Sequence, residues 1–446
     1  MTTALDRVRL AVGDATAAAR PTVRGVVDEV RGLSIRVRGV SARVGDLVHV
    51  ESRIGVPAEV VAVQDSPAGR QATCLPLGPL TGLAAGDRVT ATGGPLTINV
   101  GDALLGRVLD GLGRPLDGRP LPAGLTPTTI DSVVPDAMTR ARVDTPMPLG
   151  VRSIDTLMPI GQGQRMGIFA GSGVGKSTLL SMITRGNAAD VTVLALIGER
   201  GREVREFLED DLGPEGLRRA VVVIATSDQP PMVRLRAAFV ATRIAESFRD
   251  AGRGVLLMMD SITRLALAQR EIGLAAGEPP TTRGYPPSVF AMMPTLLERA
   301  GSSDRGSITG IYTVLVEGDD HNEPIADTAR SILDGHVVLD RRLANAGHFP
   351  AIDVLQSVSR VANAVTTPQQ RALTLELRRL IAARADVQEL VQIGAYVRGT
   401  NPTADRALAV WPAIQQFLQQ ERGDLVPAAA AWAQLAEALG TTGSAA

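Results

Sequence analysis

The chain has few of the residues that build disulfides, zinc sites and membrane spans. Its single cysteine, Cys74, excludes a disulfide within the chain. The histidines are too scattered to predict a zinc-binding cluster: His49, His321, His336 and His348. No apolar run approaches the roughly 18 residues that a membrane-spanning helix needs. The charged start MTTALDRVRL also leads us to expect no signal peptide. These absences favour a cytoplasmic protein that folds without a structural metal.

Lysine is almost absent, although basic residues are common. Lysine and arginine together number 46, and Lys176 is the one lysine among them. It lies in the segment GVGKST, where a compact ammonium group fits between phosphate oxygens and the broad guanidinium fork of arginine does not. The exception therefore indicates a position at which the chemistry of lysine is required.

The length of the chain predicts several domains. At roughly 150 residues per domain, we expect two to four of them. Residues 1–20 should begin the chain as a short helix, because Leu5, Val8 and Val12 fall on one face before the break at Arg20-Pro21. This segment has little else to bury against. It therefore either awaits a partner or frays as a terminus.

The rest of the chain predicts an α/β protein in three further parts. Residues 21–94 alternate apolar and polar side chains in short runs between turns, which predicts a small β-barrel (33–38, 47–50, 58–63 and 88–92). From 95 to 375, apolar runs alternate with helical stretches such as 178–184 and 233–248. This alternation predicts a parallel sheet covered on both faces, with strands at 166–170, 191–197, 220–225, 255–259 and 308–316. Residues 376–446 are expected to form a C-terminal helical domain with a disordered tail, TTGSAA.

The strongest signal for chemistry is AGSGVGKS at residues 170–177, which follows a predicted strand and opens a predicted helix. Its glycines allow backbone N–H groups to turn inward around phosphate oxygens, and the helix N-terminus adds its positive end. Lys176 is expected to bridge the β- and γ-phosphates of ATP, and Ser177 to ligate Mg²⁺. Ala170 stands where the strict pattern has glycine, and we expect it to keep a negative φ, where alanine costs little. The expected nucleotide-binding residues are Gly171, Ser172, Gly173, Val174, Gly175, Lys176, Ser177 and Thr178.

Two carboxylates follow predicted strands. Asp260 ends the run GVLLMMD, a position from which an aspartate holds Mg²⁺ through its water shell. Glu199, in IGER, leaves the carboxyl end of another strand and should reach the same crevice, where a carboxylate can orient and deprotonate water. An ordinary surface glutamate is the alternative for Glu199, and nothing in the spacing singles out a catalytic arginine.

Seven blocks of sequence occur in an order that resembles one family. They are FAGSGVGKSTLL, LIGERGREVREFLE, MMDSITRLALAQREI, GYPPSVF, LVEGDDHNEPIAD, RSILDGHVVLDR and HFPAIDVLQSVSR. Over about residues 20–420, the chain closely resembles the type III protein-export ATPases of flagella and injectisomes, which are relatives of the catalytic subunit of rotary ATP synthases. The flagellar system is favoured, because arginine in place of lysine is typical of a GC-rich genome in which flagella are the commoner apparatus.

The resemblance implies a RecA-like ATPase domain and roles for single residues. By this likeness, Glu199 is the catalytic glutamate and Asp260 the Mg²⁺-side aspartate. Phe349 stands where an aromatic ring stacks on adenine, with a core aromatic as the alternative. The second wall of the adenine pocket has no match, and no role is assigned near residues 420–422. Three arginines match functional positions: Arg200 and Arg264 in the phosphate pocket, and Arg360 as the finger that reaches a neighbouring subunit's γ-phosphate.

The resemblance also implies an assembly. Because one chain carries the loop, the glutamate and a finger that acts in trans, a ring of six identical chains completes every active site. The implied partners are a stator-like regulatory subunit at the N-terminus, a stalk-like coiled-coil protein in the pore, the export gate, chaperones and export substrates. The implied location is the cytoplasmic face of the inner membrane at the export apparatus.

Three alternatives predict different features. A rotary synthase subunit is disfavoured, because VQIGAYVRGTNPTADRALAV lacks an acidic run and the loop reads AGSGVGKS rather than GGAGVGKT. An RNA-translocating ring like termination factor Rho needs aromatic rings in its barrel to stack bases, yet the first aromatic residue is Phe169. A formal net charge of −1 likewise predicts no nucleic-acid partner. The third alternative is a nucleotide-binding structural subunit without turnover, against which Glu199 argues.

Overall fold

The computed structural model describes residues 24–66, 69–132, 134–136, 138–316 and 323–441. The predicted helix over residues 1–20 and the tail from residue 442 lie outside the described residues. The barrel belongs to one compact unit, and everything described from Thr97 on, apart from Ala275–Gly277, belongs to a second.

The N-terminal unit is a closed barrel of six strands in the order β1-β2-β5-β4-β3-β6, as predicted. Alternation buries one side of each strand: Ile35 and Val37 in β2, and Val48 and Val50 in β3, are fully buried. The alternation of apolar residues did not predict β1 and β5, whose patterns are less regular. The strands are β1 (Arg24–Arg31), β2 (Ser34–Arg38), β3 (Asp46–Glu51), β4 (Val56–Ser66), β5 (Gly69–Pro76) and β6 (Arg88–Pro95).

The second unit is built on a nine-stranded sheet. Its main path runs β17-β16-β10-β15-β13-β11-β12-β8, with β14 paired to β15. The pairings from β16 to β8 are parallel, and β17 and β14 are antiparallel. Every apolar run predicted as a strand of this sheet forms one. The strands are β8 (Arg107–Asp110), β10 (Arg165–Ala170), β11 (Val191–Ile197), β12 (Ala220–Ala225), β13 (Gly254–Asp260), β14 (Gly301–Ser302), β15 (Ser307–Leu315), β16 (Gly335–Leu339) and β17 (Ile352–Ser359).

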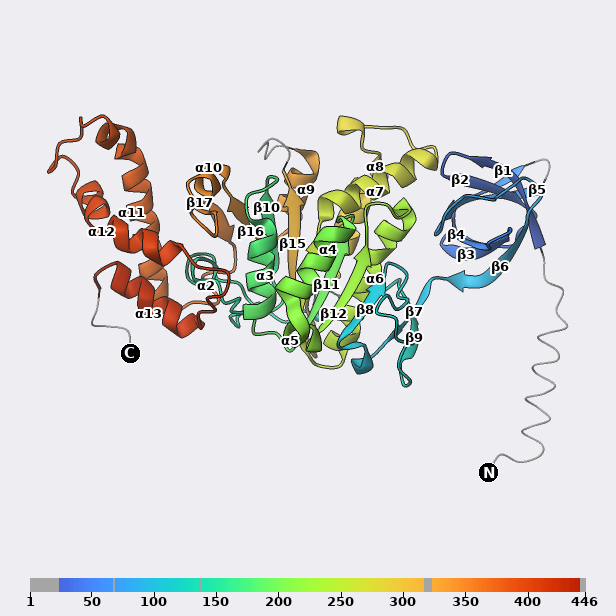
Figure 1. The fold of residues 1–446 in the computed structure, drawn as a ribbon, viewed down its shortest axis with the longest axis horizontal. Coiled ribbons are helices and arrows are strands. Elements are labelled where there is room, and N and C mark those ends of the chain that lie inside the picture. The colour runs from blue at the N-terminus through green and yellow to red at the C-terminus, as the bar shows by residue number, and fades with distance from the viewer. Residues whose placement is uncertain (1–23, 67–68, 133, 137, 317–322, 442–446) are drawn as a thin grey trace, which may run out of the picture. The chain divides into compact units, whose positions relative to one another are not determined.

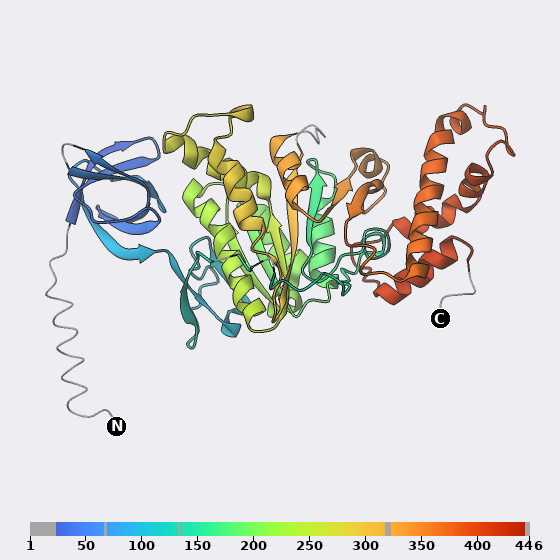
Figure 2. The ribbon, with the colours of Figure 1, turned by 180° about the vertical axis from the view of Figure 1, so that it is seen from behind.

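Helices cover both faces of this sheet, so its strands are apolar throughout rather than alternating. Figure 1 shows α3 and α5 over one face, and Figure 2 shows α6 and α7 over the other. The helices of this part are α3 (Lys176–Gly186), α4 (Gly201–Glu206), the π-helix η2 (Phe207–Leu212), α5 (Gly213–Arg218), α6 (Pro231–Asp250), α7 (Ile262–Ala275), α8 (Pro287–Leu297), α9 (Pro324–Ile332) and α10 (Arg341–Asn345). The smaller elements are η1 (Asp102–Leu104), η3 (Thr282–Gly284) and the two-stranded sheet of β7 (Thr97–Val100) and β9 (Thr126–Thr129).

The C-terminal part is helical, as predicted. It comprises α11 (Pro368–Gln392), α12 (Pro402–Leu418) and α13 (Ala428–Ala438), which pack with α2 (Arg152–Leu157). Leu377, Phe417 and Leu435 belong to the same apolar cluster as the core of the sheet. The predicted boundary at residue 376 falls inside α11, because Thr367 and Gln370 form a capping box that starts the helix at Pro368. Among the residues that the structure describes, no helix is both long and apolar enough to cross a bilayer.

Candidate active site

The phosphate loop joins the carboxyl end of β10 to the N-terminus of α3. Gly173 (φ 76°) and Gly175 (φ 92°) take left-handed backbone conformations that favour glycine. Gly175 is the N-cap of α3 and makes no side-chain cap, so the first N–H groups of the helix are available to an anion. Arg283 is the one non-glycine residue with positive φ in the described chain, so Ala170 keeps a negative φ, as expected. The loop therefore has the backbone geometry of an anion cradle.

Three charged side chains meet beneath this loop. Asp260 ends β13 and Glu199 follows β11 by two residues, so both lie at the edge of the sheet to which the loop belongs. The Lys176 ammonium contacts Asp260 Oδ1 and lies 3.6 Å from Glu199 Oε1. Thr313 Oγ1 donates a 2.6 Å hydrogen bond to Asp260 Oδ1. The structure thus brings together the lysine and both carboxylates that the sequence singled out.

Arg264 on α7 completes the charge cluster. Its Nε lies 3.4 Å from Glu199 Oε1, and its guanidinium also contacts the carbonyl of Gly198. Glu199 Oε1 is buried and accepts no hydrogen bond, so it is held by charge alone on this side. A buried carboxylate oxygen without a hydrogen-bond donor is suited to accept one from a water molecule.

Burial and the neighbouring Asp260 carboxylate raise the pKa of Glu199 to about 7, against the lowering effect of Lys176 and Arg264. Burial is the larger cause: the residue is 7% exposed. A carboxyl group whose pKa lies near neutrality is matched to general-base work at physiological pH.

A small cavity of about 110 Å³ lies beside this cluster. It is lined by residues that include Ser177, Glu199 and Asp260. A hydroxyl and carboxylates are oxygen ligands of the kind that Mg²⁺ takes, together with substrate phosphates and water. Within the described residues, no group of three or more His, Cys, Asp or Glu side chains forms a ready-made metal cage. The donor set therefore fits a Mg²⁺ ion that arrives with a nucleotide.

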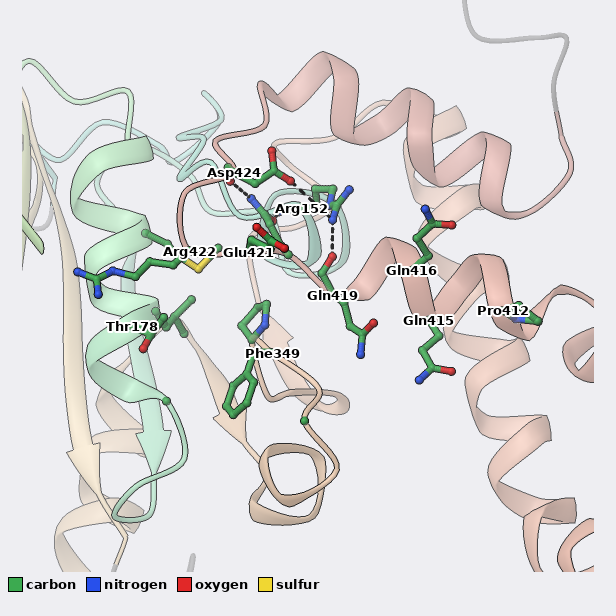
Figure 3. Close-up of a pocket in the computed structure, with 16 residues that line it drawn as sticks. Arg152, Thr178, Phe349, Pro412, Gln415, Gln416, Gln419, Glu421, Arg422 and Asp424 are labelled. Atoms are coloured by element: carbon green, nitrogen blue, oxygen red, sulfur yellow. Dashed lines mark hydrogen bonds and ion pairs between the residues drawn. The ribbon is translucent and has the colours of Figure 1, made fainter.

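A larger cavity of about 950 Å³ opens on the other side of the loop and is lined by residues that include Gly175, Thr178 and Phe349. We call it the base cavity, because it is where the base of a nucleotide is expected. Figure 3 shows Thr178 of α3 and Phe349 facing Gln415 and Gln416 of α12. The Phe349 ring is 42% exposed and lies against the loop, since a Cβ built on Gly175 would be 3.3 Å from it. This exposure argues against the alternative of a core aromatic and leaves the ring available to a ligand in the cavity.

The wall opposite Phe349 is the segment 419–424 together with the end of α12, which the sequence did not predict. Gln420 holds this segment in place: its N–H donates to Phe349 O (2.9 Å), its Nε2 donates to Gly150 O (2.8 Å), and its Oε1 accepts from Arg152 N (2.8 Å). Gln420 is 5% exposed. The only signal in the sequence was the repeated glutamine pair at 415–416 and 419–420, which by itself has no chemical specificity.

The remaining predicted residues lie apart from the cluster. Arg200 is 76% exposed at its side chain and pairs with Glu203 at 3.3 Å. Ser172 accepts a 3.0 Å hydrogen bond at its carbonyl from Arg341, and Val174 is buried.

Arg360 lies at the opposite end of the sheet from the phosphate loop of its own chain. It follows β17, and the last residue of β17 pairs with Gly335, the first residue of β16. Ala170, by contrast, pairs with Leu339 at the far end of β16. Five residues of strand separate these ends by about 13 Å. Arg360 is exposed, so its side chain is available to a second chain rather than to its own loop.

Two protein families match the chain. The nucleotide-binding domain of the ATP synthase alpha/beta family matches residues 150–359, and the T3SS EscN ATPase C-terminal domain matches residues 366–437. The second match covers the helical part that would differ most from a rotary synthase subunit. It therefore weakens that alternative.

Curated relatives and solved structures agree with these matches. The chain is 53% identical to the flagellum-specific ATP synthase of Bacillus subtilis (strain 168), over 84% of this chain and 86% of the relative. It is 55% identical to the type 3 secretion system ATPase of Xanthomonas euvesicatoria, over 79% and 80%. The assembled ATPase EscN of the enteropathogenic E. coli type III secretion system superposes with a TM-score of 0.89 at 47% identity, over 93% of this chain and 100% of that one. EscN in complex with its central stalk EscO gives a TM-score of 0.86 at 46% identity, over the same shares.

Proposed function

The chain belongs to the family of flagellar and type III secretion ATPases, and we propose that it hydrolyses ATP·Mg²⁺ at a site that a second copy of the same chain completes. As a member of this family it is a nucleotide-binding ATPase of protein export. The observation that carries the proposal is the cluster of Lys176, Glu199 and Asp260 under a glycine loop at the end of a buried strand.

The loop and Lys176 bind the triphosphate. In the structure, the Lys176 ammonium contacts the Asp260 carboxylate. When phosphate oxygens enter the loop, the ammonium turns to the β- and γ-phosphates, and Ser177 and Asp260 provide oxygen ligands on the metal side. A Mg²⁺ ion held by these two side chains would supply positive charge against the phosphate oxygens. Lysine is required because its compact charge fits this position.

Glu199 orients the attacking water and takes its proton. Its Oε1, which accepts no hydrogen bond, is the acceptor, and the raised pKa of Glu199 makes it a usable base near neutral pH. Arg264 holds the carboxylate in place from α7 and limits the rise of its pKa. Arg200, which is exposed in the single chain, faces solvent or a neighbouring copy.

Arg360 of one copy stabilises the transition state of ATP hydrolysis at the phosphate loop of the next copy. Its exposure and its position far from its own loop support action on a second copy rather than within one chain. A closed ring of identical chains then gives each loop a finger, and six copies form the ring of the proposal. Phe349 stacks on the adenine in the base cavity, and the segment 419–424 encloses it from the other side.

The proposed partners follow from the family and from one exposed surface. EscN was solved with a central stalk protein, EscO. In this chain, the tip between α11 and α12 exposes apolar side chains that no described residue covers: Leu390 (45%), Val391 (41%), Ile393 (75%) and Val397 (65%). We assign this tip to contact with a stalk-like coiled coil. A stator-like regulator at the N-terminus, the export gate, chaperones and flagellar export substrates complete the proposed system at the cytoplasmic face of the membrane. Flagellar basal-body genes beside this one would identify the flagellar system, and injectisome genes would reject it.

The test of a finger that acts in trans is subunit mixing. Lys176→Ala and Arg360→Ala are each expected to be inactive. A ring that contains subunits of both variants has some interfaces at which an intact loop meets an intact finger. Random co-assembly makes about a quarter of the interfaces complete, so co-expressed variants should regain about a quarter of the wild-type rate. The control mixes Lys176→Ala with Glu199→Gln, which both damage the loop side and should stay near zero. An inactive Lys176→Ala and Arg360→Ala mixture would refute the trans assignment.

A further inference from the structure

An ion pair joins the base cavity to η2, which lines the small cavity beside Glu199. Arg422 lines the base cavity, and its guanidinium contacts the carboxylate of Asp211. Asp211 in turn lines the small cavity that contains Ser177, Glu199 and Asp260. The pair therefore spans the two halves of the nucleotide site, although its partners are more than two hundred residues apart in sequence.

The Arg422 end belongs to the wall of the base cavity. Its side chain is 43% exposed and extends across α3 in Figure 3. A second contact, from Arg422 Nη2 to the carbonyl of Asp210, measures 3.2 Å. The carbonyl of Arg422 also accepts a 2.6 Å hydrogen bond from Arg185, at the end of α3. Arg422 thus connects the segment 419–424 both to the end of α3 and to η2.

The Asp211 end belongs to an irregular helix. Asp211 lies in η2, a π-helix that continues α4, and α4 begins two residues after Glu199. π-helical turns are rare and occur often at functional sites. The Asp211 side chain is 13% exposed, so its charge lies in a partly dry environment close to Glu199 rather than in open solvent.

A role confined to packing does not account for this arrangement. Gln420 already fixes the segment 419–424 to Phe349 and Gly150. Surface ion pairs with two exposed partners contribute little to stability, whereas the Asp211 side chain is only 13% exposed and lines the small cavity that contains Glu199. The pair of Asp211 and Arg422 therefore connects the base cavity to the small cavity that contains Glu199, and not to the apolar core.

We propose that Asp211 and Arg422 are positioning residues through which an occupied base cavity sets the position of Glu199, so that the base of the nucleotide governs kcat as well as affinity. This inference rests on the proposed ATPase function. It assigns neither residue a contact with the reacting phosphate. It predicts that the wild-type chain turns over ATP faster than UTP, whose smaller base fills the cavity less completely, by at least about fivefold in kcat.

The experiment measures kcat and KM for ATP and for UTP in wild type, Asp211→Asn, Arg422→Gln and the double variant. Each single variant should lose kcat for ATP by the same factor as the wild-type preference, at least about fivefold, and leave kcat for UTP unchanged, so that the ratio of kcat for ATP to kcat for UTP falls to about one. The double variant should be no worse than either single variant, because both remove the same link. Arg422→Gln alters a side chain that is 43% exposed, so the variant should fold, and a thermal melt that coincides with wild type is the check.

The matched control is Asp210→Asn, which removes a neighbouring exposed carboxylate and keeps the carbonyl that Arg422 contacts. It should behave as wild type. Equal kcat for ATP and UTP in wild type overturns the proposal, as does a ratio that survives in both single variants. A change confined to KM, or an equal loss in Asp210→Asn, also overturns it. Failure of wild type to release phosphate from ATP is a different result, because it overturns the ATPase function itself.

Discussion

The charge on Arg264 should set the pH dependence of turnover. Its Nε lies 3.4 Å from Glu199 Oε1, and the arginine side chain is 29% exposed. At that distance two unit charges interact by about 1.2 kcal/mol in a water-like dielectric and by about 5 kcal/mol at an effective dielectric of 20. Partial exposure screens the pair toward the lower figure. About 1.2 kcal/mol corresponds to a shift of about 0.9 pKa units.

Removing the charge should therefore raise the pKa of Glu199 by about one unit. The guanidinium stabilises the ionised carboxylate, so Arg264→Gln makes ionisation harder and a higher pH is needed to form the base. We predict that kcat/KM rises with pH and is half-maximal near the pKa of about 7 in wild type, and near 8, about one unit higher, in Arg264→Gln. The quantity kcat/KM reports the ionisation of groups in the free enzyme.

The assay is phosphate release at low ATP from pH 5.5 to 9.5, with each profile normalised to its own maximum. Both enzymes face the same ionisation of ATP, so a difference between profiles belongs to the protein. Arg264→Lys, which keeps a positive charge, should retain a profile close to wild type even where its rate is lower. Superimposable profiles for wild type and Arg264→Gln, or a shift to lower pH, would refute the electrostatic account of Glu199.

Three further predictions follow from the same geometry. Because Lys176 is the one lysine, an amine-reactive acylating reagent should modify only Lys176 and the N-terminal amine. ATP·Mg²⁺ should slow the modification of Lys176, which peptide mass spectrometry can measure. If the nucleotide does not slow this modification, the place of Lys176 in the loop is contradicted. Phe349→Ala should raise KM for ATP by roughly tenfold with little change in kcat, since stacking on a base contributes about 1–3 kcal/mol; an unchanged KM would remove the ring from the site. Glu246→Ala leaves Arg299, which is 2% exposed and pairs with it at 2.7 Å, as an uncompensated buried charge. It should lower the free energy of unfolding in urea by about 3–5 kcal/mol, and an equally stable variant would show that this pair does not hold α6 to the segment after α8.

Local pattern was sufficient for much of the fold. Apolar runs such as 191–197 and 220–225 became β11 and β12 because a strand buried on both faces needs no polar alternation. The phosphate loop could be read from eight residues, since each glycine and the lysine have a local physical reason. Asp260 and Glu199 could be placed beside it because the carboxyl ends of parallel strands share one edge of the sheet.

Features made by distant segments could not be read in this way. The wall of the base cavity needs Gln420 to reach Phe349 and Gly150, and no local pattern encodes those contacts. The pair of Asp211 and Arg422 depends on η2, whose π-helical turn has no periodicity that the sequence reveals. The start of α11 was different: the capping box at Thr367 and Gln370 was visible in TPQQ but was placed outside the predicted helical part.

The most direct test compares Mg²⁺-dependent phosphate release by the wild-type chain, Lys176→Ala and Glu199→Gln at saturating ATP. We predict steady turnover by wild type and none above background by either variant, with nucleotide binding retained by Glu199→Gln and weakened in Lys176→Ala. Circular dichroism melts that coincide with wild type would exclude unfolding as the cause. Undiminished phosphate release by Lys176→Ala would contradict the account at its centre, because it would place the chemistry somewhere other than the glycine loop.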